Sequence, residues 1–274
     1  MTVRLVATDL DNTLLRDDLS LSPRTRAALA GVRAAGVMTV PVTARQPMGL
    51  REVAEDAGFT EWALCSNGSL AVHLTTGERL HESTLSVRAQ QRLARALAER
   101  VPGLLFVSVR DGGETFVSQD GYSQLAALTY GDHKRDPASM GSYPLEEVLA
   151  EPSLKLIVRH PEMSAAELYD EVTALGIADC AVTMSGAPFV EVMAAGTSKA
   201  WGLARLCEQL DIDRAEVLAF GDARNDVEML VWAGHGVAVA NAAPEARAAA
   251  DEVTGSNLED GVALVLERLL DRGV

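Results

Sequence analysis

Short apolar runs and amphipathic stretches alternate through the first third of the chain. The run Val3–Thr8 is apolar and rich in β-branched residues, which predicts a buried strand. Ser22 and Pro23 suit the start of a helix, and Gly36 suits its end. The other elements predicted here are strands at Val37–Val42 and Trp62–Cys65 and a helix at Pro47–Ala57.

The last third repeats this alternation. It contains predicted strands at Val217–Phe220 and Gly236–Ala240 and predicted helices at Ser198–Leu210, Asn225–Ala233, Pro244–Ala250 and Leu258–Leu270. Strands that are apolar almost throughout, joined by helices, indicate a parallel sheet covered on both faces. The two ends of the chain are therefore predicted to form one α/β domain with a doubly wound, Rossmann-like parallel sheet.

The middle of the chain has a different pattern. Two hairpins are predicted, one from Leu70–Leu74 and Arg79–His81 and one from Leu104–Arg110 and Thr115–Ser118. A helix at Val87–Arg100, a strand at Leu154–His160, a helix at Ala165–Leu175 and a strand at Ala181–Met184 complete the region. This mixture predicts an α+β domain, residues 82–188, inserted into a core made of residues 1–81 and 189–274.

Composition narrows the possible partners. The 274 residues include 48% hydrophobic and 23% charged residues, typical of a globular protein, and the net charge is −15. That charge opposes binding to nucleic acid and to anionic membranes. The three cysteines form no CxxC pair, and Asp9 and Asp11 interrupt any N-terminal signal core, so a cytoplasmic location is expected. Oligomeric state is left open.

The first chemical motif is Asp9-Leu10-Asp11-Asn12-Thr13-Leu14, directly after the first strand. Side chains alternate in an extended segment, so Asp9 and Asp11 are expected to point the same way. Ligands of doubly wound sheets bind beyond the carboxyl ends of the strands. Two carboxylates there repel each other unless a cation or proton intervenes. A solvated turn is the alternative interpretation of this motif alone.

The second motif, Gly221 to Asp226 (GDARND), follows the strand Val217–Phe220. It adds Asp222 and Asp226 to the same edge of the sheet. Several carboxylate oxygens suit Mg²⁺, a hard cation that can bridge to a substrate phosphate. A capped helix start near Asn225 is the alternative, and the two roles can coexist.

Two further residues are suited to an anion. Thr43 ends the second strand, where its hydroxyl and the following backbone N–H groups could hold phosphoryl oxygens. Lys199 opens a helix and could provide a positive charge for phosphate. Taken separately, Thr43 is a common strand-end residue and Lys199 a common surface residue.

Together these motifs resemble the haloacid dehalogenase-like (HAD) superfamily of phosphohydrolases. The DLDNTL run resembles its first motif, Thr43 its second, Lys199 its third and GDARND its fourth. The inserted α+β domain resembles the large cap of the Cof-type branch, which includes many sugar phosphatases. The segment Cys65 to Gly68 resembles that branch's Asn-Gly loop, and Phe189–Val192 resembles its strand before the Lys motif. Asn12, Ala44 and Ala200 stand where glycine is common in the family.

The resemblance implies an Mg²⁺-dependent phosphatase acting on small phosphorylated metabolites, with sugar phosphates foremost. It implies that Asp9 attacks phosphorus to form an aspartyl-phosphate and that Asp11 is the general acid and base. The metal would bind the Asp9 and Asp222 carboxylates and the Asp11 carbonyl. Phosphoryl oxygens would be held by Thr43, Lys199, Asn225 and the backbone at Leu10 and Ala44. Asp226 would support Lys199 or a metal-bound water, the cap would close over the site, and Asn67 is a candidate substrate contact.

Two other functions are compatible with the same residues. A phosphomutase-type phosphotransferase would use the same nucleophile but pass the phosphoryl group to a second hydroxyl. A non-catalytic phosphosugar-binding protein would not need a nucleophile and an acid/base together, so the presence of both Asp9 and Asp11 disfavours it.

Overall fold

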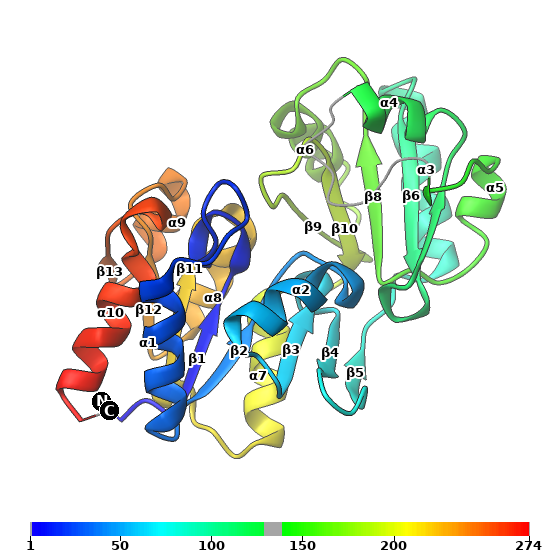
Figure 1. The fold of residues 1–274 in the computed structure, drawn as a ribbon. Coiled ribbons are helices and arrows are strands. Elements are labelled where there is room, and N and C mark those ends of the chain that lie inside the picture. The colour runs from blue at the N-terminus through cyan, green and yellow to red at the C-terminus, as the bar shows by residue number, and fades with distance from the viewer. Residues whose placement is uncertain (1, 129–138, 274) are drawn as a thin grey trace. The chain divides into compact units, whose positions relative to one another are not determined.

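A computed structural model describes residues 2–128 and 139–273 (Figure 1). The chain forms two compact units. The first unit contains Met1–Arg45, Leu50–His81 and Ser198–Val274, and the second contains Gln46–Gly49 and Glu82–Thr197.

The first unit is built on a parallel sheet with the strand order β13-β12-β11-β1-β2. Its strands are β1 (Leu5–Thr8), β2 (Met38–Pro41), β11 (Val217–Gly221), β12 (His235–Ala238) and β13 (Glu252–Val253). The central strand β1 lies between β2 and β11, with Leu5 opposite Met38 on one side and Val217 on the other. All residues of β1 and β11 are buried, as their continuous apolar sequences predict.

Helices cover both faces of this sheet, so the predicted doubly wound parallel sheet is confirmed. In Figure 1, α1 (Pro23–Ala34) packs with α10 (Gly261–Asp271) on the near face, and α8 (Val227–Trp232) lies behind the sheet. The remaining helices of the unit are α7 (Lys199–Gln209), which packs on α8, α9 (Pro244–Ala249) and most of α2 (Pro47–Ala57). Helix α1 begins as predicted, because the Ser22 side chain accepts a hydrogen bond from the Thr25 N–H.

A small three-stranded sheet lies beside β2. It consists of β3 (Trp62–Cys65), β4 (Leu70–His73) and β5 (Arg79–Glu82), in that order. The Thr43 N–H donates to the Leu64 carbonyl at 2.8 Å, which ties β3 to the chain just after β2. The first predicted hairpin is thus present, and β3 pairs with it rather than extending the parallel sheet by a full strand.

The second unit contains an antiparallel sheet in the order β7-β6-β8-β10-β9. The strands of this sheet are β6 (Leu105–Arg110), β7 (Thr115–Ser118), β8 (Lys155–Arg159), β9 (Cys180–Thr183) and β10 (Val190–Ala194). The helices of the second unit are α3 (Val87–Arg100), α4 (Tyr122–Leu128), α5 (Leu145–Val148) and α6 (Ala165–Ala174). Apolar residues of α3 and α6 pack on one face of the sheet. Tyr122 and Ala126 of α4 pack on the other.

The sequence placed the inserted domain at residues 82–188. In the structure the second unit includes Gln46–Gly49, begins again between His81 and Glu82 and ends only between Thr197 and Ser198. The reason is that Val190–Ala194 pairs with β8 and β9 of the antiparallel sheet. The expected core strand is therefore a strand of the second unit.

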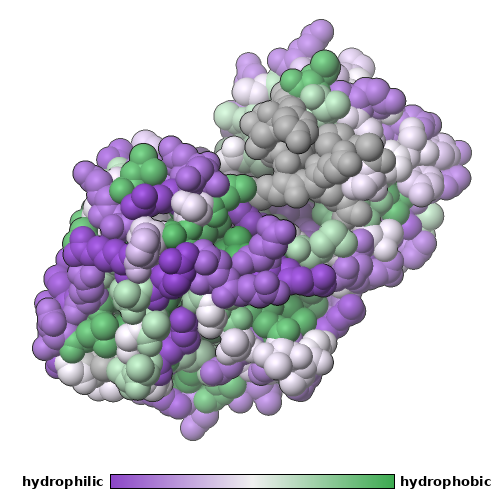
Figure 2. All heavy atoms as spheres, in the orientation of Figure 1, coloured by the Kyte–Doolittle hydropathy of each residue, from purple (hydrophilic) through white to green (hydrophobic). Residues whose placement is uncertain are grey.

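Hydrophilic residues cover much of the visible surface in Figure 2, consistent with the net charge of −15. Within residues 2–128 and 139–273, no helix combines the length and the apolar character needed to cross a membrane.

Candidate active site

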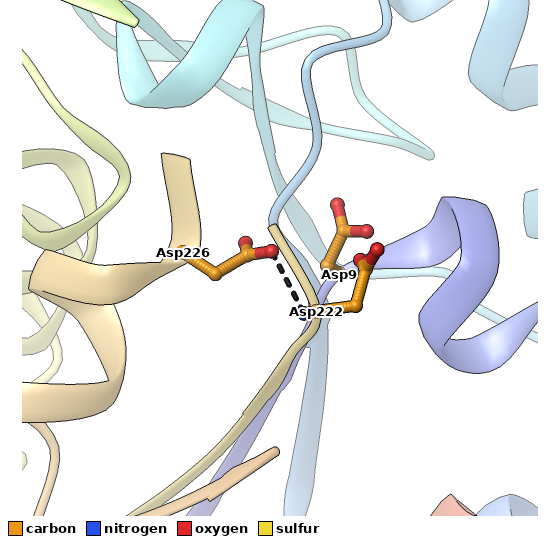
Figure 3. A group of neighbouring side chains, drawn as sticks. All are labelled: Asp9, Asp222 and Asp226. Atoms are coloured by element: carbon orange, nitrogen blue, oxygen red, sulfur yellow. Dashed lines mark hydrogen bonds between the residues drawn. The ribbon is translucent and has the colours of Figure 1, made fainter. Parts of the chain in front are cut away.

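Two aspartates lie at the carboxyl ends of adjacent parallel strands. Asp9 follows β1 and Asp222 follows β11, and the Asp9 N–H donates to the Phe220 carbonyl at 3.0 Å. Figure 3 shows their carboxylates side by side, with Asp226 reaching toward the backbone of Asp222 from the following helical turn. One oxygen from each of the three carboxylates lies within 4.8 Å of the others. The structure therefore brings together the two motifs that are about 210 residues apart in the sequence.

Lys199 is the cation of this cluster. Its side chain is completely buried, and its Nζ donates to Asp9 Oδ1 at 2.6 Å and to Asp226 Oδ1 at 2.5 Å. Burial opposes the positive charge, but the carboxylates of Asp226 and Asp9 more than offset this and raise the pKa of Lys199. Lys199 is thus held as a cation against the predicted nucleophile, rather than lying on the surface.

The surroundings of Asp9 and Asp222 disfavour the charged forms of both carboxyl groups. Burial, chiefly, raises the pKa of Asp9 to about 7, although Lys199 acts in the opposite direction. Burial, together with the neighbouring charges of Asp9 and Asp226, raises the pKa of Asp222 to about 8. One lysine is therefore too little positive charge for this group of acids at neutral pH.

Both carboxylate oxygens of Asp226 have hydrogen-bond partners within the protein. Its Oδ1 accepts from Lys199, and its Oδ2 accepts the backbone N–H groups of Asp222 at 3.0 Å and Ala223 at 2.9 Å. Gly221 makes this close approach possible, since a Cβ there would lie 2.4 Å from the Cβ of Asp226. Asp226 thus fixes both Lys199 and the turn that carries Asp222.

Asp222 is oriented by a residue that the sequence reasoning did not select. The Thr13 hydroxyl donates to Asp222 Oδ1 at 2.8 Å, and both groups are buried. Thr13 belongs to the helical turn Leu10–Leu14, in which Asn12 has a φ of 60°. Asn tolerates this left-handed conformation, which agrees with its place in the first motif. Leu10 is buried in the same turn.

Asp11 is paired with Arg45. The Arg45 Nε donates to Asp11 Oδ2 at 3.0 Å and its Nη2 donates to Oδ1 at 2.6 Å, which is a bidentate ion pair. The Arg45 side chain is 8% exposed and the Asp11 side chain 21%. Arg45 lies 34 residues from Asp11, so local patterns in the sequence could not predict this partner. Such pairs favour the ionised carboxylate and fix its orientation.

Thr43 lies where it was expected, fully buried after β2. Its hydroxyl accepts the backbone N–H of Arg45 at 3.1 Å. This N–H group, on the far side of Ala44, therefore already has a hydrogen-bond partner. Its carbonyl accepts the Asn67 N–H at 3.0 Å.

Asn67 and Asn225 meet side chain to side chain. The Asn225 Nδ2 donates to Asn67 Oδ1 at 3.0 Å, and both residues are buried. The Asn225 Oδ1 is buried and has no hydrogen-bond partner among the described residues. The second and fourth motifs therefore contact the Asn-Gly loop directly, a link that the sequence could not reveal.

Comparison with known proteins agrees with this arrangement. Residues 6–266 match the family of haloacid dehalogenase-like hydrolases, so the chain belongs to that family, and the predicted resemblance to it and to its Cof-type branch is confirmed. The chain is 27% identical over 270 residues to a putative phosphatase of Haemophilus influenzae, covering 97% of this chain and 98% of that protein. It is 27% identical over 272 residues to pyridoxal phosphate phosphatase YbhA of Escherichia coli, covering 96% and 97% of the two chains.

A solved structure has the same fold. BT1666 of Bacteroides thetaiotaomicron, a phosphatase of the HAD superfamily, matches with a TM-score of 0.81 at 24% identity and covers 98% of this chain and 95% of its own. The likeness extends over the whole length of both chains, so the inserted second unit is part of the shared fold.

Proposed function

We propose that this protein is an Mg²⁺-dependent phosphatase that hydrolyses small phosphorylated metabolites through an aspartyl-phosphate on Asp9. The observation that carries the proposal is the buried cluster at the sheet edge, where carboxylate oxygens of Asp9, Asp222 and Asp226 lie within 4.8 Å of one another and Lys199 pairs with Asp9 and Asp226. A buried group with this excess of carboxylates is costly unless it binds a cation.

The oxygen donors of this cluster fit magnesium. The carboxylates of Asp9 and Asp222 and the backbone carbonyl of Asp11 are the proposed ligands, all of them hard oxygens. The two carboxylates with pKa values of about 7 and 8 are the ones that a cation would most relieve. When bound, Mg²⁺ would supply positive charge beside the nucleophile and polarise the phosphoryl group.

Asp9 is the proposed nucleophile. One of its oxygens attacks phosphorus, the bond to the leaving oxygen breaks, and the phosphoryl group is transferred to the carboxylate. Lys199, which contacts Asp9 Oδ1, neutralises part of the charge that builds up on the transferred group. Thr43, Asn225 and the backbone at Leu10 and Ala44 are proposed to hold the phosphoryl oxygens.

Asp11 is the proposed acid and base. It gives a proton to the leaving oxygen and then takes one from the water that hydrolyses the aspartyl-phosphate. The ion pair with Arg45 fixes the orientation of the Asp11 carboxylate, and it must open before Asp11 can carry the proton that the acid step needs. We expect Arg45 to shift away when Asp11 carries the proton.

The substrate class is a small phosphorylated metabolite, with sugar phosphates as the first candidates. The name of one relative, pyridoxal phosphate phosphatase, supports a small phosphorylated metabolite as the substrate class. The second unit is proposed to be the cap that reads the leaving group. A cytoplasmic location is also proposed, in keeping with three cysteines that are all free thiols.

The test is phosphate release from a panel of phosphorylated metabolites and p-nitrophenyl phosphate, with Mg²⁺ and with EDTA. We expect release that depends on the metal, and a loss of at least about 10⁴-fold in kcat for Asp9→Asn. Asp271→Asn, at the exposed end of α10, is the matched control and should keep full activity. An Asp9→Asn protein with full Mg²⁺-dependent activity would exclude Asp9 as nucleophile.

The same assay separates the alternative functions. An isomerised phosphosugar with little inorganic phosphate would indicate a phosphomutase-type transferase. Binding of phosphosugars without turnover of any compound would indicate a non-catalytic binding protein.

A further inference from the structure

The turn Ser66–Gly68, between β3 and β4, has an unusual backbone. Its three residues have consecutive positive φ angles of 51°, 56° and 86°. Glycine adopts such angles freely and asparagine tolerates them, but Ser66 does so at a cost of roughly 1 kcal/mol or more. A turn of this kind persists only where its surroundings hold it in place.

Three parts of the active site are attached to this turn. Its backbone N–H groups donate to the carbonyls of Arg45, at 2.9 Å, and Thr43, at 3.0 Å. The side chain of Asn67 accepts the hydrogen bond from Asn225. The turn therefore connects the second motif to the fourth.

The turn also supports the helix that begins with Lys199. A Cβ on Gly68 would lie 2.4 Å from the Ser198 carbonyl oxygen, and a Cβ on Gly202 would lie 2.7 Å from the Gly68 carbonyl oxygen. The two backbones are thus in direct contact, with no room for a side chain between them. Any shift of Gly68 would be passed to the first turn of α7.

His81 of β5 holds the last residue of this turn. Its Nε2 lies 3.0 Å from the Gly68 carbonyl oxygen, and since a carbonyl only accepts, Nε2 must carry the proton. The ring packs edge-on against Trp201 of α7, with the ring centroids 4.8 Å apart. The imidazole therefore contacts the turn and the Lys199 helix at once.

The surroundings of His81 favour the neutral ring. Its Nδ1 is buried and has no hydrogen-bond partner among the described residues, so a second N–H would find no acceptor. Burial lowers the pKa of His81; the hydrogen bond to Gly68 acts in the opposite direction, and the nearby guanidinium of Arg205 adds to the lowering. The single tautomer that donates to Gly68 is thus the stable form at neutral pH.

We propose that His81 is a positioning residue for phosphate binding, acting through the Gly68 carbonyl to fix Asn67, Asn225 and the start of the Lys199 helix. This rests on the proposed function, in which Asn225 and Lys199 bind the phosphoryl group. On this view Asn67 positions Asn225 instead of reading the substrate.

The test compares His81→Phe, His81→Gln and a control, His73→Phe. Phenylalanine keeps a ring against Trp201 but removes the donor, whereas glutamine offers an N–H at the reach of Nε2. His73 is matched because it also packs edge-on against a tryptophan, Trp62, with centroids 5.2 Å apart, but it makes no contact with the Ser66–Gly68 turn that the structure records. Melting temperatures of all three variants report any general loss of stability.

The readouts are the Kd of inorganic phosphate with Mg²⁺ by calorimetry, KM and kcat on p-nitrophenyl phosphate, and the side-chain amide resonance of Asn225. The resonance is assigned by its disappearance in Asn225→Asp. We expect His81→Phe to weaken phosphate binding and raise KM by roughly five- to tenfold, the effect of one lost hydrogen bond. It should also shift the side-chain amide resonance of Asn225. His81→Gln should restore most of the phosphate affinity, the KM and the position of this resonance.

Several results would overturn the proposal. One is a His81→Phe protein with wild-type phosphate affinity and an unmoved Asn225 resonance. Another is an equal effect of His73→Phe on the phosphate affinity and on the Asn225 resonance, which would indicate loss of packing alone. A folded His81→Gln protein that behaves like His81→Phe would exclude the hydrogen bond as the cause. The Asn225 resonance still tests the proposal if the wild-type protein turns over no substrate, so the two failures are distinguishable.

Discussion

Replacing Asp222 by Asn should stabilise the metal-free protein while removing its response to Mg²⁺. Asparagine has the shape of aspartate and still accepts from Thr13, but it carries no charge into the cluster of acids. A carboxyl whose pKa is higher in the folded chain than in the unfolded chain favours folding at low pH. That contribution is lost as the pH rises from the unfolded value, 3.8, to the folded value, about 8 for Asp222.

The magnitude follows from the pKa. At about 1.36 kcal/mol per pKa unit, the rise from 3.8 to about 8 corresponds to roughly 6 kcal/mol for a carboxyl titrating alone. Asp9 and Asp222 share their protons and the site relaxes around them, so we expect about 2 kcal/mol of added stability at pH 8 in EDTA. At pH 5 the folded wild type has a neutral group at this position but the unfolded chain is already largely ionised, so the difference should shrink to roughly a third of its value at pH 8.

Urea unfolding in EDTA at pH 5 and pH 8, repeated at pH 8 with Mg²⁺, measures the free energy of unfolding of the wild type and of Asp222→Asn. The wild-type protein should gain stability with Mg²⁺ concentration as expected for a ligand of the native state, and Asp222→Asn should not. The exposed control Asp271→Asn should follow the wild type throughout. A variant that is no more stable than the wild type at pH 8, or that responds equally to Mg²⁺, would refute the reasoning.

Two further predictions concern buried contacts. Thr13→Val removes the 2.8 Å hydrogen bond to Asp222 and should weaken Mg²⁺ affinity by about 10-fold or more, measured as the metal dependence of turnover, while Thr13→Ser keeps it. In the second unit, Lys155 Nζ lies 2.5 Å from Glu191 Oε1, and both side chains are buried. Lys155→Met should cost about 3–5 kcal/mol in urea unfolding, and adding Glu191→Leu should recover most of it; an unchanged single variant would contradict this.

The elements of the fold were largely predictable, because each depends on residues close together in the sequence. The apolar runs that became β1 and β11 and the helix Val87–Arg100 are read from local periodicity alone. The short helices α4 and α5 and strand β13 were not predicted, and α5 and β13, with 4 and 2 residues, are too short to show a period.

The pairing of β10 could not be predicted either, because its apolar sequence suits a strand in either unit. For the same reason the motifs predicted which residues form the site, but not what holds them. Arg45 on Asp11, Thr13 on Asp222 and Asn67 on Asn225 are contacts between residues far apart in the sequence, and only the folded chain brings them together.

The strand order of the first unit has a consequence for synthesis of the chain. Strand β1 is synthesised long before its neighbour β11, which begins at Val217. Until Val217 emerges, β1 has an apolar, unpaired edge, while the antiparallel sheet of the second unit is complete once Val190–Ala194 has emerged. Nascent chains that stop before Val217 should therefore contain a native-like second unit and an aggregation-prone β1 segment, so chaperones should be needed until β11 is available.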